Sequence, residues 1–582
     1  MRCPRVASAP LRVLPLLAGL FALACREAPD EGGAPVSPFP PGAELETDFD
    51  QPIRLSYVCG NRFLVTNAHT VPVSVQYRVR GSSEEGHVDL AAAPNEDPAF
   101  SEAMLEVRSR GVVELFVDGR PLRARANEGV PCSPATPAPS LLSAAGPEES
   151  GEWTAPFDWP IVAVHLMLLP SGKVLSWGHY GAPQLWDPAS GLFSEVPSPV
   201  LLFCAGQALT ADGRLLAAGG HISDDHGLPD ITIFEPAGTW SQSVKMMRGR
   251  WYPTTTAGPN GEMVIVAGQD EAGTLVALPE VWFNGTIRTL TTASKSIAYY
   301  PRMFLAPNGK YFVAGEDWRS RYLSIAGTGA WSGNYPRRFV NRTYGSAVMY
   351  DYGKILYAGG GYVTNTAEVI DLTKSPPAWQ WTGSMAYPRR NLNLTVLPTG
   401  EVLATGGTGG TTTSDLTQAA HAAELWSPST GQWTTLASNV VSRGYHATSI
   451  LLPDGRVLHS GSGDAANQVD ERNAEIFSPP YLFRGARPMI SAAPPELHYG
   501  ISAKVSTPDP AAIARVTLIR LGAATHAFDM GQRFQRLSFT RLATQVKVTI
   551  PTNRNRTPPG HYMLFLLNSL QVPSVGAIVQ VK

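Results

Sequence analysis

Ala211-Asp212-Gly213-Arg214-Leu215-Leu216 is a tight-turn sequence that runs directly into an apolar strand, and the chain repeats this pattern many times. Pro259-Asn260-Gly261-Glu262-Met263-Val264 and Pro453-Asp454-Gly455-Arg456 are further copies. The spacings between successive turn glycines are 41, 48, 48, 44, 47 and 55 residues. The seven glycines are Gly172, Gly213, Gly261, Gly309, Gly353, Gly400 and Gly455.

A period of about 45–50 residues built from short strands is the kelch signature of a β-propeller, and seven units fit the usual four to eight blades. The repeat covers residues 153–482. Residues 46–132 alternate as in Val73–Val79, and residues 483–582 carry strand-like runs between Pro and Gly turns. We therefore predict an all-β chain: a seven-bladed kelch β-propeller flanked by an N-terminal and an immunoglobulin-like C-terminal β-sandwich domain.

The N-terminus has the pattern of an export signal. Arg2, Arg5 and Arg12 precede an apolar run over residues 13–23 that is too short to span a membrane. Residues 1–24 are thus expected to be a signal peptide cut before Cys25, either as a lipoprotein that carries lipid on Cys25 or by plain Ala-x-Ala cleavage. The protein is then a bacterial cell-surface or outer-membrane lipoprotein, or it is secreted. Residues 25–45 and 133–152 are rich in Pro. We predict that the first range is a tether and the second a linker.

Composition and cysteine count narrow the function. The formal net charge is −2, charged residues are 16%, and no basic run suits a nucleic-acid partner. We expect a monomer that touches a membrane only through a lipid on Cys25. Cys59 and Cys132 bracket the first β-rich segment and predict a disulfide in an oxidising compartment. Cys204 is left without a partner, either as a buried inert thiol or as a functional group.

One position of the repeat carries chemical side chains. In a propeller, residues at equivalent places before the inner strands surround the axis at one mouth. Tyr445 directly precedes one of these residues, His446. Imidazole nitrogen and phenolate oxygen suit Cu(II), although a single His is too few. For Tyr300 and Tyr344 simple aromatic packing is an equal alternative. Counting nine residues back from each turn glycine gives Ala163, Cys204, Tyr252, Tyr300, Tyr344, Asn391 and His446.

The order of motifs resembles the galactose oxidase and glyoxal oxidase family of copper radical oxidases. The resemblance covers about residues 153–582, and each motif is weak alone but strong in this order and domain plan. The matching stretches are Phe203–Gly206, Gly249-Arg250-Trp251-Tyr252-Pro253-Thr254, Arg443-Gly444-Tyr445-His446 through Arg456, Ala474–Leu482, Thr525-His526, Pro558–Phe565 and Val572-Pro573-Ser574.

This resemblance implies roles for individual residues. Tyr252 would be a copper ligand joined to Cys204 by a thioether bond, and together they would form a protein-derived radical cofactor. Tyr445 would be the axial ligand and the base that accepts the substrate's hydroxyl proton. His446 and His526 would complete the metal ligands.

The implied activity is oxidation of a primary alcohol or small aldehyde, with reduction of O₂ to H₂O₂. The alternative is a kelch propeller used only as a binding or adhesion surface, which offers no reason for these residues to share one repeat position. A hydrolase with another metal is a weaker rival, because the ring lacks carboxylate ligands.

The sequence departs from galactose oxidase at one point. The Trp that stacks over the crosslinked Tyr in that enzyme is missing from Val266–Gly273. Trp318 could replace it, although ordinary blade packing is the better explanation of Trp318. Arg302, Arg389 and Arg390 are candidates for substrate binding or for structural ion pairs, His221 and His226 are expected in solvent, and His165 is expected to be a satisfied core residue.

Overall fold

The computed structural model describes residues 53–67, 71–91, 101–117, 120–127 and 146–582, except 316–318, 340, 362, 411 and 466–467. The expected signal peptide, the tether with Cys25, Cys132 and Trp318 lie outside the described residues, and nothing is described of the Cys59 side chain. No helix of the described part is both long and apolar enough to span a membrane.

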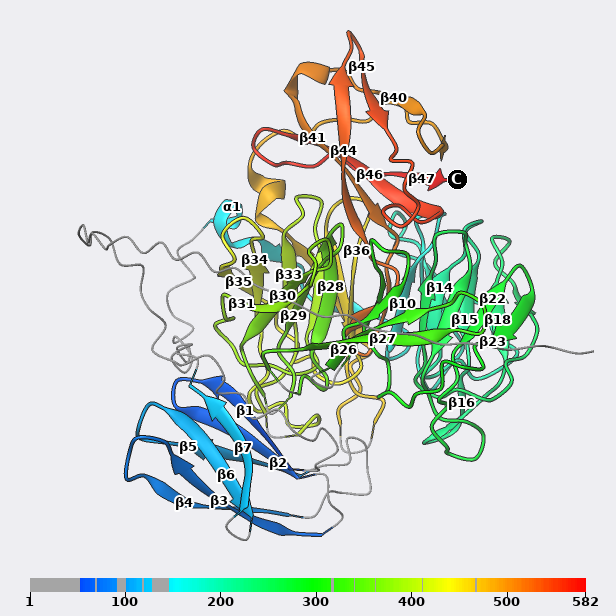
Figure 1. The fold of residues 1–582 in the computed structure, drawn as a ribbon. Helices are drawn as coiled ribbons and strands as arrows, with labels where there is room; N and C mark the ends of the chain where they lie inside the picture. The colour runs from blue at the N-terminus through cyan, green and yellow to red at the C-terminus, as the bar shows by residue number, and fades with distance from the viewer. Residues whose placement is uncertain are drawn as a thin grey trace, which may run out of the picture. The chain divides into compact units, whose positions relative to one another are not determined.

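The N-terminal strands form two small antiparallel sheets, shown in blue in Figure 1. Alternation along Val73–Val79 buries Val75 and Val79 against the other sheet, as period-two patterning requires. The first sheet has the order β1-β2-β5 and the second β4-β3-β6-β7. The strands are β1 (Ile53–Cys59), β2 (Arg62–Asn67), β3 (Val73–Val79), β4 (Glu85–Leu90), β5 (Ser101–Glu106), β6 (Val112–Val117) and β7 (Arg120–Ala126).

Residues 152–478 form seven antiparallel blades, coloured from cyan to yellow in Figure 1, which confirms the seven-bladed propeller. Five of the sheets have four strands, and those of the first and seventh blades carry additional strands. A short helix, α1 (Pro147–Ser150), precedes the first strand, β8 (Glu152–Trp153). β8 supplies the outer strand of the seventh blade, so the two ends of the repeat close the ring. β9 (Phe157–Asp158) pairs with the same blade.

The blades follow one another along the chain. Blade 1 has β10 (His165–Leu168), β11 (Val174–Trp177), β12 (Gln184–Trp186) and β13 (Phe193–Glu195); blade 2 has β14 (Gly206–Leu209), β15 (Leu215–Ala218), β18 (Ile231–Phe234) and β19 (Trp240–Gln242); blade 3 has β20 (Thr254–Ala257), β21 (Met263–Val266), β22 (Glu280–Phe283) and β23 (Thr286–Thr289). Blade 4 has β24 (Met303–Leu305), β25 (Tyr311–Val313), β26 (Arg319–Ser324) and β27 (Ala330–Pro336); blade 5 has β28 (Ser346–Asp351), β29 (Lys354–Ala358), β30 (Ala367–Asp371) and β31 (Trp379–Thr382). Blade 6 has β32 (Asn393–Val396), β33 (Val402–Thr405), β34 (Ala422–Trp426) and β35 (Trp433–Ser438); blade 7 has β36 (Ala447–Leu451), β37 (Val457–Gly461) and β38 (Asn473–Ser478) with β8.

All seven turn glycines adopt a left-handed backbone, with φ between 71° and 92°. Each one lies in the turn between the first and second strands of its blade. A residue with a Cβ is disfavoured in that conformation, which explains why the repeat keeps Gly at this position.

A buried Arg–Glu pair ties the loop before each of four inner strands to its own blade. Arg389, whose side chain is fully buried, lies 2.5 Å from Glu424 on β34 and also donates to the carbonyl of Gly406. This confirms the structural reading of Arg389 over substrate binding. The other pairs are Arg250–Glu280 at 2.8 Å, Arg342–Glu368 at 2.6 Å and Arg443–Glu475 at 3.2 Å.

The C-terminal strands form one sheet with the order β39-β47-β46-β41-β44-β45-β40, orange to red in Figure 1. A hairpin leaves this domain after β41 and adds its strand β42 to the inner strand β10 of blade 1. The 3₁₀ helices are η2 (Pro480–Phe483) and η3 (Pro510–Ala512), and the strands are β39 (Glu496–Leu497), β40 (Ser502–Ser506), β41 (Ile513–Arg520), β42 (Ala523–Thr525), β43 (Phe528–Asp529), β44 (Phe534–Arg541), β45 (Gln545–Thr549), β46 (Gly560–Asn568) and β47 (Ala577–Val581).

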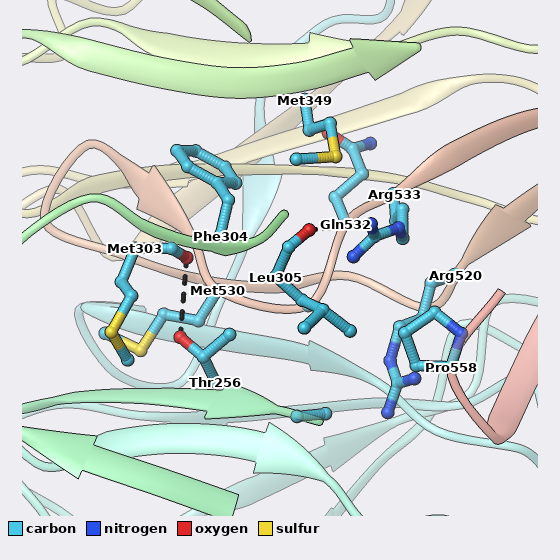
Figure 2. Close-up of a pocket in the computed structure, with 12 residues that line it drawn as sticks. Thr256, Met303, Phe304, Leu305, Met349, Arg520, Met530, Gln532, Arg533 and Pro558 are labelled. Atoms are coloured by element: carbon cyan, nitrogen blue, oxygen red, sulfur yellow. Dashed lines mark hydrogen bonds between the residues drawn. The ribbon is translucent and has the colours of Figure 1, made fainter. Parts of the chain in front are cut away.

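Arginines of the C-terminal domain donate to carbonyls at the ends of inner strands of the propeller. Arg520 binds the carbonyl of Leu209 at 2.8 Å, and Arg533 binds that of Leu305 at 2.8 Å. Both arginines line a cavity of about 30 Å³ beside the inner strands of blades 3 and 4 (Figure 2). There Thr256 donates to the carbonyl of Met303 and joins these two blades (Figure 2). These contacts hold the hairpin that carries His526 against the propeller.

Candidate metal centre

Six of the seven residues that lie nine positions before the turn glycines have a strained backbone. From Cys204 to His446 all six have a positive φ, between 41° and 66°, whereas Ala163 does not. Left-handed non-glycine residues cost about 1–3 kcal/mol each and gather at functional sites. Each of the six lies one to three residues before the inner strand of its blade.

Backbone hydrogen bonds link these residues from one blade to the next. The Tyr252 N–H donates to the carbonyl of Cys204 at 3.0 Å, and the Tyr300 N–H donates to that of Tyr252 at 2.9 Å. Asn391 makes the same bond to Tyr344 at 2.8 Å. The repeat position predicted from the nine-residue offset is therefore a ring of neighbouring residues in space.

Four side chains converge within this ring and the hairpin. The hydroxyl oxygens of Tyr252 and Tyr445 lie 2.5 Å apart, and Nε2 of His526 lies 3.1 Å from the Tyr252 hydroxyl. The rings of His446 and His526 have their centres 4.6 Å apart. These residues come from blade 3, blade 7 and the C-terminal hairpin, so only the folded chain brings them together.

The hydrogen bonds of the two histidines fix their tautomers. Nδ1 of His446 lies 2.6 Å from the carbonyl of Gly463, which can only accept, so this nitrogen carries the proton. Its Nε2 is buried and has no hydrogen-bond partner. Thr525 donates its hydroxyl proton to the carbonyl of Val164 and accepts from Nδ1 of His526 at 2.6 Å. Both imidazoles therefore have an unprotonated Nε2, as a metal ligand must, and that of His526 faces the Tyr252 hydroxyl.

Burial controls the protonation of the site. It lowers the pKa of His446 to about 3 and that of His526 well below its usual value, so both rings are neutral. Burial also raises the pKa of Tyr252 and of Tyr445 well above 10, which keeps both phenols protonated unless a cation replaces the proton.

Cys204 is fully buried, and it is the free cysteine among the described residues. Burial raises the pKa of its thiol, and a hydrogen bond with Tyr252 opposes that shift in part. His165, fully buried on β10, accepts the backbone N–H of Cys204 on Nε2 at 3.2 Å and bonds Gln207 through Nδ1 at 3.0 Å. This confirms the expectation that His165 is a satisfied core residue.

Trp251 stacks on Tyr252, a contact that the motifs of the sequence did not predict. The two ring centres are 3.9 Å apart and the planes differ by only 5°. A Trp therefore covers the candidate Tyr although the stretch Val266–Gly273 has none. The available signal was the aromatic neighbour itself, since Trp251 directly precedes Tyr252.

The remaining candidate residues lie outside the centre or have a structural role. His221 is 8% exposed, so the expectation of solvent exposure was wrong, while His226 is half-buried and bonds the carbonyl of Asp224. Arg302 donates to the carbonyls of Tyr300 and Gly345. Tyr300 stacks beside Tyr252 at 4.8 Å and donates to the carbonyl of Ala205, so packing accounts for it.

The donor set fits Cu(II). Two neutral imidazoles and two phenols meet in one place, and one buried Nε2 has no other partner. The described residues contain no cluster of three or more His, Cys, Asp or Glu suited to a metal, so the phenols would have to contribute.

Comparisons with known proteins find a matching domain family, similar sequences and a similar fold. Residues 487–581 match the galactose oxidase-like early set domain. The chain is 27% identical over 485 residues to a galactose oxidase of Gibberella zeae, which covers 74% of this chain and 70% of that protein. It is 29% identical over 482 residues to the aldehyde oxidase GLOX of Vitis pseudoreticulata, covering 72% and 88%.

A solved fungal alcohol oxidase of the AA5 family, in complex with copper, has the same fold. Its TM-score is 0.67 at 24% identity, and the match covers 75% of this chain and all of that one. The resemblance predicted from the motifs is thus confirmed.

Proposed function

We propose that this chain, a relative of the galactose oxidases and glyoxal oxidases, is a copper radical oxidase acting on a primary alcohol or small aldehyde, with O₂ as acceptor and H₂O₂ as product. One observation carries the proposal. Two phenol oxygens and two imidazoles with an unprotonated Nε2, from three distant segments, meet beside a buried free thiol.

Tyr252, Tyr445, His446 and His526 would hold the metal. Gly463 and Thr525 accept from Nδ1 of the two rings and so leave each Nε2 unprotonated for it. Copper, when bound, supplies a Lewis acid for the substrate oxygen and takes up one electron. Because the metal must displace phenol protons, its binding should release protons.

Cys204 and Tyr252 would be joined by a thioether bond. Its formation removes one hydrogen from the thiol and one from the ring, and O₂ takes up both. The bond would make Tyr252 easier to oxidise to a radical. Trp251, flat against the Tyr252 ring, would shield that radical from solvent.

Tyr445 and Tyr252 would divide the oxidation of the substrate. Tyr445, as phenolate, takes the hydroxyl proton on its Oη, which lies at 2.5 Å from that of Tyr252. The Tyr252 radical takes a hydrogen atom from the adjacent carbon. The overall reaction balances as RCH₂OH + O₂ giving RCHO + H₂O₂.

Reconstitution with copper in air tests the proposal. The purified protein should lose two hydrogens in mass and yield a linked Cys204–Tyr252 peptide, while Cys204→Ser should do neither. A peroxide-coupled screen of alcohols and aldehydes then identifies the substrate. Unlinked peptides in the wild type would exclude the radical mechanism and favour a propeller that only binds.

The cellular location is part of the same proposal. Residues 1–24 would direct export, and Cys25 would provide a lipid anchor where the lipoprotein route is used. Metabolic labelling with a tagged fatty acid, compared with Cys25→Ala, separates an anchored from a fully secreted protein.

A further inference from the structure

Blade 2 carries a hairpin beyond its four strands. It consists of β16 (His221–Ser223) and β17 (His226–Gly227), inserted between β15 and β18. Its tip is polar and exposed, but its first residue, His221, is buried. The hairpin is anchored through the His221 N–H, which donates to the carbonyl of Leu201 at 3.0 Å, and through the Gly220 N–H, which donates to that of Arg250 at 3.2 Å.

His221 accepts the indole N–H of Trp251. The Trp251 Nε1 lies 3.2 Å from Nδ1 of His221, and an indole can only donate, so Nδ1 is unprotonated. Burial lowers the pKa of His221 below 6.5, which favours this neutral acceptor. The hydrogen bond satisfies a buried donor that would otherwise cost about 1–3 kcal/mol.

His221 also contacts the segment that holds Cys204. Its ring packs edge to face on Phe203, with centres 5.3 Å apart, and on His179, at 4.7 Å. Phe203 directly precedes Cys204, and Trp251 directly precedes Tyr252. One imidazole therefore touches the neighbours of both residues of the proposed thioether.

We propose that His221 is a positioning residue that holds Trp251 flat over Tyr252 through this hydrogen bond. The inference deepens the proposed function and rests on it. Without the acceptor, the indole N–H must turn toward water to find a partner, and the stack with Tyr252 opens. A proposed radical on Tyr252 would then be less shielded and shorter-lived.

Three variants separate hydrogen bonding from packing. His221→Phe keeps an aromatic ring but removes the acceptor, and His221→Gln restores an acceptor oxygen. His226→Phe changes the half-buried histidine on the second strand of the same hairpin and serves as the control. After copper loading and one-electron oxidation, the lifetime of the radical is followed by its optical and electron paramagnetic resonance signals.

We expect the radical of His221→Phe to decay at least about threefold faster than the wild type, whereas His221→Gln and His226→Phe stay near it. An unchanged lifetime in His221→Phe, or a loss in His221→Gln as large as in His221→Phe, overturns the role of the hydrogen bond.

A second measurement needs neither copper nor a radical. Hydroxyl-radical footprinting of the metal-free protein should find the Trp251 peptide protected in the wild type and His221→Gln, and more oxidised in His221→Phe. Equal protection in all three contradicts the proposal. If the wild type forms no thioether, the proposed function fails, while footprinting still decides whether His221 orients Trp251.

Discussion

His526 reaches the candidate metal centre with a φ of 45°, in the left-handed region that residues with a Cβ avoid. Its hairpin strand pairs with blade 1, and Thr525 at the end of that strand fixes its ring. Strain at His526 and at the ring residues is thus held by neighbouring hydrogen bonds. Each of the two proposed histidine ligands thus depends on a second residue, Gly463 or Thr525, for its tautomer.

Thr525 offers a direct test of that dependence. Thr525→Val removes the oxygen that accepts from Nδ1 of His526, so the ring loses its fixed tautomer and orientation. We expect copper affinity to fall by about 10–100-fold, the usual cost of losing such a partner. Thr525→Ser keeps the hydroxyl and should bind within about threefold of the wild type in a competition titration. Equal affinities for Val and Ser would contradict the assignment.

Buried histidines should make folding sensitive to acid. Burial lowers the pKa of His459, on β37, to about 3, while an unfolded imidazole titrates near 6.5. The unfolded chain therefore takes up the proton first as the pH falls. Stability from His459 is complete above about pH 6.5 and is lost toward pH 3, by about 1.4 kcal/mol per pH unit.

The pH effect is measured as the free energy of unfolding in guanidinium at pH 7 and pH 5. In the wild type, Nδ1 of His459 donates to the carbonyl of Thr448. His459→Asn places an amide there, and an amide does not titrate. The variant should lose about 2 kcal/mol less than the wild type between these pH values. His498→Asn, at an exposed His, should follow the wild type, and equal slopes in all three proteins would refute the prediction.

At the scale of the blade, the loops before four of the inner strands are each fastened by a buried Arg–Glu pair. Arg250, Arg342 and Arg389 each stand two residues before a ring residue, and each pairs with a Glu on the third strand of the same blade. The Glu also accepts a backbone N–H, as Glu424 does from Ala386 at 2.5 Å. The pair thus fixes the backbone that presents the chemical side chains.

Breaking one such pair should be costly, and removing both partners should not. Arg389→Met leaves Glu424 as an unpaired buried charge and should destabilise the protein by about 3–5 kcal/mol. The double variant Arg389→Met with Glu424→Leu should recover much of that loss. Arg456→Met, which breaks a partly exposed pair with Asp454, should cost less than about 1 kcal/mol. A double-mutant cycle by guanidinium unfolding decides, and additive losses would contradict the argument.

Local patterns predicted the blades because turn chemistry is local. A left-handed turn needs Gly, so seven glycines locate seven first hairpins, and a constant offset locates the ring. The orientation of Trp251 could not be predicted in this way, because it depends on the left-handed backbone of Tyr252 and on an acceptor in another blade. The burial of His221 likewise depends on how an inserted hairpin packs. The Arg that stands two residues before a ring residue is visible in the sequence and could have indicated the buried ion pair, but the repeat period alone did not.

At the scale of the whole molecule, the candidate centre links three parts of the chain. Tyr252 lies just before the inner strand of blade 3, Tyr445 and His446 lie just before that of blade 7, and His526 comes from the C-terminal hairpin. A metal bound by all of them adds its binding free energy to the folded state only, because the unfolded chain separates them. The C-terminal domain is therefore expected to be part of the cofactor site as well as a cap on the propeller.

This linkage predicts a thermal shift that depends on His526. Copper at about 1,000 times its Kd stabilises the folded state by about 4 kcal/mol, so the Tm of the wild type should rise by several degrees and fall again with a chelator. His526→Ala should lose most of that rise, although the contacts of Arg520 and Arg533 with the ends of two inner strands remain. His498→Ala, in the same domain but exposed, should keep it. A full copper-induced shift in His526→Ala would mean that the hairpin does not contribute a ligand, and the metal would then have to be held by the propeller alone.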